Sequence, residues 1–229
     1  MKLEWQEAHP KNYREGRGGA KVDRVVIHIA AGTLRGTAAW FQNPEAKVSA
    51  HFTVGADGTV IQSVSEKNTA FHAGPVPPGQ PDMNPRSIGI EHEGFQNAAK
   101  PWVPTDAQLD ATAQLVAGIC QRHGIPVDRT HLIGHSEVFP GRAARAHCPG
   151  AGWPWDRFLA LVHQHMLVRP EAPKPAPKPQ PSPPAPPADP AKRTVRLMDA
   201  GTNLPIGTGT LVNDKVYLTP DTLKQLRDS

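Results

Sequence analysis

The chain has 229 residues, of which 38% are hydrophobic and 20% charged, and its formal net charge is +4. This composition is typical of a globular protein with one or two domains. A small positive charge spread along the chain does not indicate nucleic-acid binding. No apolar run reaches the roughly 18–20 residues that span a bilayer, so insertion into a membrane is not expected.

The distribution of proline divides the chain. Eleven of its 26 prolines fall within residues 170–190. Because proline lacks an amide donor and fixes φ, this stretch cannot build a core and should form an extended spacer. We therefore expect a first domain at residues 1–169, a linker at 170–191 and a small β-rich module at 192–229.

The first domain alternates strand and helix patterns. Short apolar or β-branched runs predict five strands, at residues 25–29, 49–54, 59–64, 87–92 and 131–134. Residues 32–36 are expected to form a loop. Capping and periodicity predict three helices, at residues 37–42, 105–123 and 156–167. This order predicts a mixed central β-sheet flanked by helices, in an α/β or α+β fold.

The tail after the proline-rich stretch carries two strand patterns, at residues 194–198 and 215–218. They lie on either side of a turn-rich segment at 201–209, and a short helix is expected from Thr219. A unit of this length holds only a small core.

Histidine and cysteine are confined to one part of the chain. All eleven histidines lie between His9 and His165, so chemistry is expected in the first domain. The two cysteines, Cys120 and Cys148, have a spacing that gives no support to a disulfide, and we expect two free thiols.

Three residues are candidate metal ligands. His28 lies near the end of a predicted buried strand, where sites open in sheet proteins, although such a histidine also suits a core position. His135 lies between Gly and Ser, in what could equally be a surface turn, and Cys148 precedes Pro-Gly. Two nitrogens and one sulfur suit zinc, and three protein ligands leave the fourth position open, as in catalytic sites.

A carboxylate is also available to handle protons. Glu91 and Glu93 follow an apolar run and share one face of the predicted strand, because side chains alternate with period two. Either could act as a general base near a metal. The alternative is a solvated strand end.

The ordered motifs of the first domain resemble a known family. Between about Arg24 and Leu161 the chain reads VVIHIAAG, SAHFTVGADGTVIQ, AFHAG, SIGIEHEGF, GHSEVFPGR and HCPG. This series resembles the zinc-dependent N-acetylmuramoyl-L-alanine amidases, which include amidase-type phage lysozymes and peptidoglycan recognition proteins. The resemblance implies that His28, His135 and Cys148 bind zinc, and that Glu91 assists the attacking water.

The resemblance also implies roles for residues around the metal. His72 matches a histidine that lines the substrate groove, and Asn84 is predicted with it to bind substrate. Two residues before the third ligand, many members carry a Lys, Thr or His that stabilises the transition state, but Ala146 occupies that position here. Arg145 and His147 are the predicted catalytic substitutes.

The implied activity is hydrolysis of the bond between N-acetylmuramic acid and L-alanine in peptidoglycan. The linker and tail favour a lytic enzyme of the endolysin or autolysin type. Wall targeting, protein docking and a structural cap are the alternatives for the tail. A non-catalytic peptidoglycan-binding protein, a zinc endopeptidase and a cytosolic muropeptide-recycling amidase are the alternatives. We expect a monomer made in the cytoplasm without a signal peptide, which acts on the cell wall after holin action or lysis if it is phage-derived.

Overall fold

The computed structural model of the chain describes residues 2–95, 101–139, 147–167, 192–198, 205–212 and 215–218. The chain divides into two compact units, Met1–Pro170 and Glu171–Ser229. The proline-rich stretch at 170–190 lies outside the described residues, so its predicted extended form stays a prediction. No helix among the described residues is long and apolar enough to cross a bilayer.

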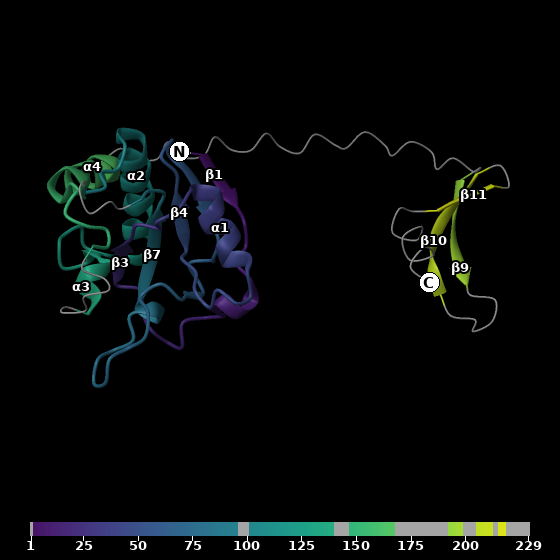
Figure 1. Cartoon of the computed structure of the whole chain (residues 1–229), viewed down its shortest axis with the longest axis horizontal. Helices are drawn as coiled ribbons and strands as arrows, with labels where there is room; N and C mark the ends of the chain where they lie inside the picture. The colour runs from purple at the N-terminus through teal and green to yellow at the C-terminus, as the bar shows by residue number, and fades with distance from the viewer. Residues whose placement is uncertain are drawn as a thin grey trace. The chain divides into compact units, whose positions relative to one another are not determined.

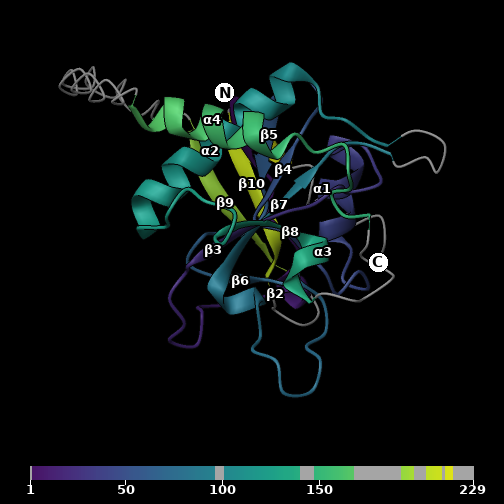
Figure 2. The ribbon, with the colours of Figure 1, turned by 90° about the vertical axis from the view of Figure 1, so that its left-hand side faces the viewer.

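The first unit is built on a six-stranded mixed sheet in the order β1-β5-β4-β7-β3-β8 (Figure 1). Its strands are β1 (Lys2–Trp5), β3 (Arg24–Ile27), β4 (Phe52–Val54), β5 (Thr59–Gln62), β7 (Ser87–His92) and β8 (Leu132–Gly134). β3 runs parallel to both β7 and β8, and β4 runs parallel to β7. Figure 2 shows β3, β7 and β8 with the left-hand side of Figure 1 turned toward the viewer. The predicted mixed sheet is confirmed.

The first unit also contains smaller elements outside the six-stranded sheet. They are the strands β2 (Tyr13–Arg14) and β6 (Thr69–Ala70), which pair with each other, and the short 3-10 helices η1 (Pro10–Asn12) and η2 (Asn84–Arg86). None of these elements has a run of regular apolar spacing. The sequence patterns therefore did not predict them.

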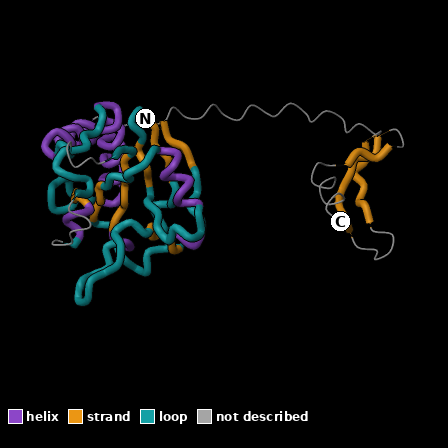
Figure 3. Tube along the Cα trace, viewed as in Figure 1, coloured by secondary structure: helices purple, strands orange, loops and turns teal. Residues whose placement is uncertain are grey.

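Helices cover both faces of the sheet (Figure 3). α2 (Asp106–His123) and α4 (Trp155–Leu167) pack on one face, and α1 (Leu34–Gln42) packs on the other. The strand residues divide accordingly: Val60 joins the cluster under α2, whereas Ile61 contacts the cluster of α1. This alternation is the period of two that a strand imposes on its side chains.

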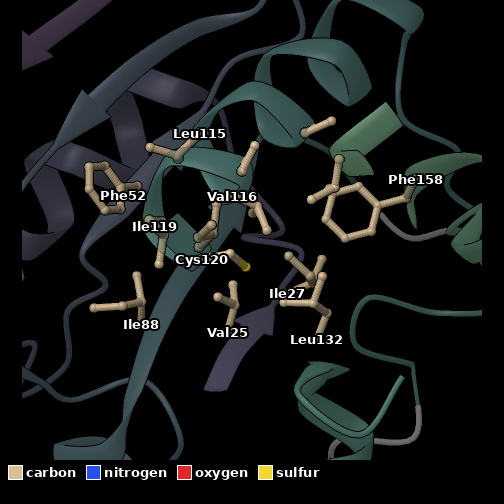
Figure 4. Close-up of a cluster of buried hydrophobic side chains, with 14 of the residues drawn as sticks. Val25, Ile27, Phe52, Ile88, Leu115, Val116, Ile119, Cys120, Leu132 and Phe158 are labelled. Atoms are coloured by element: carbon tan, nitrogen blue, oxygen red, sulfur yellow. The ribbon is translucent and has the colours of Figure 1, made fainter. Parts of the chain in front are cut away.

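The larger hydrophobic cluster contains one of the two cysteines (Figure 4). Cys120 projects from α2 toward Val25 of β3 and is 1% exposed. Burial raises the pKa of the Cys120 thiol to about 12, so this side chain packs as a small apolar group. Cys120 and Cys148 are not joined in a disulfide, as predicted.

Local capping residues were sufficient to predict the ends of α2 but not the start of α1. α2 begins after Thr105, whose hydroxyl accepts from Gln108 N at 3.1 Å, and Gly124 ends it with φ +67°. The prediction for α1 was wrong at its start. This helix begins at Leu34, inside the expected loop, because the Thr33 hydroxyl accepts from Gly36 N at 3.1 Å.

The second unit contains the antiparallel strands β9 (Lys192–Met198), β10 (Pro205–Val212) and β11 (Lys215–Leu218), in the order β11-β10-β9. The outer two strands correspond to the two predicted ones. The middle strand was missed because its PIGTGTLV sequence, with two glycines and a proline, reads as a turn. The helix expected from Thr219 lies outside the described residues.

We predict that residues 1–169 fold without the second unit. The buried members of all four hydrophobic clusters in the described chain come from between Ala8 and Val162. On heating, the truncated protein should unfold cooperatively. Its melting temperature should lie within about 3 °C of that of the first unit in the full chain, a shift that corresponds to about 1 kcal/mol in the free energy of unfolding. Loss of the cooperative transition would contradict this boundary.

Candidate active site

Three parallel strands bring the candidate residues to one edge of the sheet (Figure 2). His28 directly follows β3, and Glu91 is the penultimate residue of β7. His135 directly follows β8 and opens the short helix α3 (His135–Val138). Because parallel strands end at the same edge, this is where sites form in open sheets of this kind.

The predicted metal ligands lie together. Donor atoms of His28, His135 and Cys148 are all within 4.8 Å of one another, and Nδ1 of His28 lies 3.8 Å from Sγ of Cys148. A tetrahedral zinc ion would separate a nitrogen from a sulfur by about 3.6 Å, given the usual bond lengths. The donor set and its spacing therefore fit a metal ion.

Cys148 is held in place by the backbone around it. Its Sγ accepts from Ile29 N at 3.4 Å, and its carbonyl accepts from Ser136 N at 2.9 Å. Gly134 makes this approach possible, because a Cβ at that position would lie 2.8 Å from Cδ of Pro149. The glycine of the GHS motif thus lets the 147–150 segment lie against the end of β8.

A buried histidine secures the backbone of His28. Nδ1 of His92 donates to the His28 carbonyl at 2.8 Å, and Nε2 of His92 lies 2.9 Å from Oγ1 of Thr112 in α2. Burial lowers the pKa of His92 to about 4, and the His28 carbonyl, which can only accept, requires a proton on Nδ1. The sequence motif SIGIEHEG contains His92, but nothing in its pattern indicated this role.

The structure places both predicted substrate-binding residues behind His28. Nδ1 of His72 lies 3.1 Å from Nε2 of His28, and His72 is 7% exposed. Burial lowers the pKa of the His72 imidazole well below its ordinary value. Oδ1 of Asn84 accepts from the backbone amides of His72 and Ala73, at 3.0 and 2.8 Å. Substrate binding by His72 and Asn84 stays a prediction.

The two candidate carboxylates have different surroundings. Oε1 of Glu91 lies 3.7 Å from Nδ1 of His28, and Oε2 is buried without a hydrogen-bond partner among the described residues. Burial raises the pKa of Glu91 to about 8. Glu93 instead accepts from Ala56 N at 2.9 Å, in the turn between β4 and β5. Only Glu91 lies beside the ligand set.

The environment of Glu91 is a second test of whether a metal ion fits. A carboxylate with a buried oxygen that makes no hydrogen bond is costly to ionise unless a positive charge lies close to it. No described lysine or arginine forms an ion pair with Glu91. A cation at the three donors would stabilise the ionised carboxylate.

A network that sequence reasoning missed supports His135. Oε2 of Glu137 accepts from Gly134 N at 2.7 Å, and both Glu137 oxygens accept from Nη2 of Arg129, at 2.8 and 2.7 Å. The Arg129 guanidinium in turn lies 3.3 Å from the centroid of the Trp155 ring. Glu137 stands three residues after Gly134, the spacing of a helix-capping acid, which is the one local signal for it.

A hollow of 330 Å³ opens beside Glu91. It is lined by the loop after β3 and by α1, including the half-exposed Trp40 and the exposed Val48. Ala31 in its wall has φ +50°, a conformation that non-glycine residues adopt at a cost and that is common at functional sites.

The remaining predicted residues lie near the third ligand. Arg145 and Ala146 are outside the described residues. His147 is exposed and directly precedes Cys148. The catalytic roles predicted for Arg145 and His147 stay predictions.

Two histidines and a glutamate at the ends of parallel strands, with a cysteine beside them, suit a metal-dependent hydrolase. The profile of the N-acetylmuramoyl-L-alanine amidase family matches residues 18–151. N-acetylmuramoyl-L-alanine amidase A of Achromobacter lyticus is 30% identical over 174 residues, which cover 69% of this chain and 92% of that protein. The chain therefore belongs to the N-acetylmuramoyl-L-alanine amidase family.

A further relative and two solved structures extend the comparison. The 1,6-anhydro-N-acetylmuramyl-L-alanine amidase AmpD of Citrobacter freundii is 35% identical over 117 residues, covering 51% of this chain and 58% of that protein. The crystal structure of an AmpD derivative superposes with a TM-score of 0.56 at 26% identity, over 71% of this chain and 95% of the other. Staphylococcus aureus AmiA, at 18% identity, 73% and 84% coverage and a TM-score of 0.54, shares the fold.

These findings confirm the predicted enzyme class. The chain is a peptidoglycan amidase that cleaves the bond between N-acetylmuramic acid and L-alanine. The presence of all three candidate ligands in one cluster agrees with an active enzyme rather than a binding protein.

Proposed function

We propose that His28, His135 and Cys148 hold one zinc ion and that Glu91 is the general base of the amidase. The observation that carries this proposal is the position of the partly buried Glu91 carboxyl, 3.7 Å from a candidate ligand nitrogen. When bound, zinc supplies a Lewis acid that polarises the amide carbonyl and lowers the pKa of a water molecule.

The chemistry of the donors supports zinc over other metals. Two imidazole nitrogens and a thiolate suit a borderline-soft ion, whereas magnesium and calcium prefer oxygen ligands. Among the described residues the cluster holds three side chains, which would leave a coordination position for the reaction. This arrangement supports a catalytic site rather than a closed structural one.

Glu91 handles the protons of the reaction. Oε2, which has no hydrogen-bond partner among the described residues, accepts a proton from the attacking water. The same oxygen then delivers this proton to the leaving nitrogen of L-alanine. His147 or Arg145 donates a hydrogen bond to the developing oxyanion, where one such donor typically contributes about 3–4 kcal/mol.

The substrate occupies the hollow beside Glu91. Its wall presents the faces of Trp40 and Val48, which suit the apolar edge of a sugar or the methyl group of alanine. Glu91 also lines this hollow, and its Oε1 lies 3.7 Å from Nδ1 of His28. A substrate bound there has its amide next to the base.

We propose that the enzyme's substrate is the peptidoglycan of the cell wall. The long match to a protein named simply as an N-acetylmuramoyl-L-alanine amidase supports this choice. A second candidate is recycling of anhydromuropeptides, because the AmpD relatives named for that substrate match 117 residues at up to 35% identity.

We predict that Glu91→Gln lowers kcat by about 10²–10⁴-fold without loss of folding, because glutamine cannot accept a proton. Glu93→Gln is the matched control, since Glu93 contacts the Ala56 turn and not the ligand cluster. Its activity should stay near that of the wild type. Parallel kinetics on soluble muropeptides would reject the assignment if Glu93→Gln were the impaired variant.

The two cellular roles predict different substrate preferences. A wall-lytic amidase should release stem peptides from purified, intact peptidoglycan with a kcat/KM at least equal to that on 1,6-anhydro-muropeptides of the same stem. Mass spectrometry of both digests measures this ratio. A strong preference for the anhydro substrate, with intact peptidoglycan left uncut, would instead favour the recycling role.

A further inference from the structure

We propose that His72 is a positioning residue, which fixes His28 in the tautomer that directs the Nδ1 lone pair toward the metal site. The proposal rests on the zinc site proposed above. It is carried by a chain of hydrogen bonds that runs from His28 through His72 and Ser87 to the backbone of Met83. It assigns His72 a role different from the substrate contact that the sequence implies.

The direction of the chain is set at its far end. The Met83 carbonyl can only accept, so the Ser87 hydroxyl donates its proton there, at 2.7 Å. The same hydroxyl oxygen lies 3.1 Å from Nε2 of His72. Because its proton is already committed, Ser87 accepts from this nitrogen. Nε2 of His72 therefore carries a proton.

This assignment fixes the next link. The buried His72 favours the neutral imidazole, which holds one proton, so Nδ1 has a lone pair. That lone pair accepts from Nε2 of His28 at 3.1 Å. A neutral His28 then has its own lone pair on Nδ1, the atom 3.8 Å from Sγ of Cys148. Such hydrogen bonds to the second nitrogen of a ligand histidine orient the ring and raise its basicity.

The position of the His72 ring is itself determined by the fold. Asn84 anchors the backbone of His72 and Ala73 through two amide hydrogen bonds. Gly89 of β7 leaves space for the ring, because a Cβ at this position would lie 2.3 Å from Cγ of His72 and 2.6 Å from Nδ1. The glycine in SIGIE thus allows the imidazole to rest directly on the strand.

The test uses full-length protein and measures zinc affinity by competition with a chromophoric chelator. His72→Leu removes the acceptor and should weaken zinc binding by about 10–100-fold. His72→Asn places an amide oxygen where Nδ1 lies and should recover most of the affinity. Gly89→Ala, which displaces the ring without touching a ligand, should also weaken binding. Gly118→Ala in α2 is the matched control, because its Cβ would meet only the flexible Arg122 side chain.

The tautomer of His28 can also be measured directly, in wild-type protein without metal. Long-range ¹H–¹⁵N spectra of the metal-free wild type should assign the proton of His28 to Nε2. A proton on Nδ1 would overturn the relay, whatever the zinc measurements give.

The affinity series separates this proposal from its rivals. Wild-type affinity in both His72→Leu and Gly89→Ala, with only KM raised, would overturn the positioning role in favour of substrate contact. If His72→Leu fails to fold, Gly89→Ala and the His28 spectrum still decide. If the wild type binds no zinc, the proposed metal site fails, while the tautomer result continues to test the relay by itself.

Discussion

The parallel pairing of β3 with both β7 and β8 is the constraint on which the site depends. It carries three chain segments to the same edge of the sheet and ends them there. His28 and His135, which directly follow β3 and β8, are far apart in sequence, yet their donor atoms lie within 4.8 Å. If either neighbour of β3 ran antiparallel, its terminal side chain would emerge at the opposite edge. The strand topology therefore determines which side chains can meet in the site.

Burial then makes the site specific. His28, His72 and His92 are all nearly inaccessible, and each is hydrogen-bonded to another buried group. Inside a protein such bonds are strong, and leaving one unmade is costly. The imidazoles are consequently restricted to single orientations before any ligand arrives. Glu91 is the exception, since its environment disfavours the ionised carboxyl until a cation is present.

Features with local or ordered signals could be predicted from the sequence. The Thr105 cap and Gly124 stop of α2 depend on neighbouring residues, and the motif series predicted that His28, His135 and Cys148 cluster with Glu91 beside them. The sequence could not predict the Arg129–Glu137 support, the clearance that Gly134 gives Pro149, or the place of His72 behind His28. Each of these contacts joins distant segments that only tertiary packing brings together. The strand β10 was not predicted because its glycines indicate a turn, although they lie in a paired strand.

Zinc K-edge X-ray absorption of the zinc-loaded full chain tests the central claim most directly. The account predicts one sulfur at about 2.3 Å and nitrogen ligands at about 2.0–2.1 Å. Cys148→Ser should remove the sulfur contribution, and Cys120→Ser, which alters the buried thiol of α2, should leave it intact. A wild-type spectrum without sulfur, or loss of sulfur in the Cys120 variant, would contradict the assignment of the metal centre.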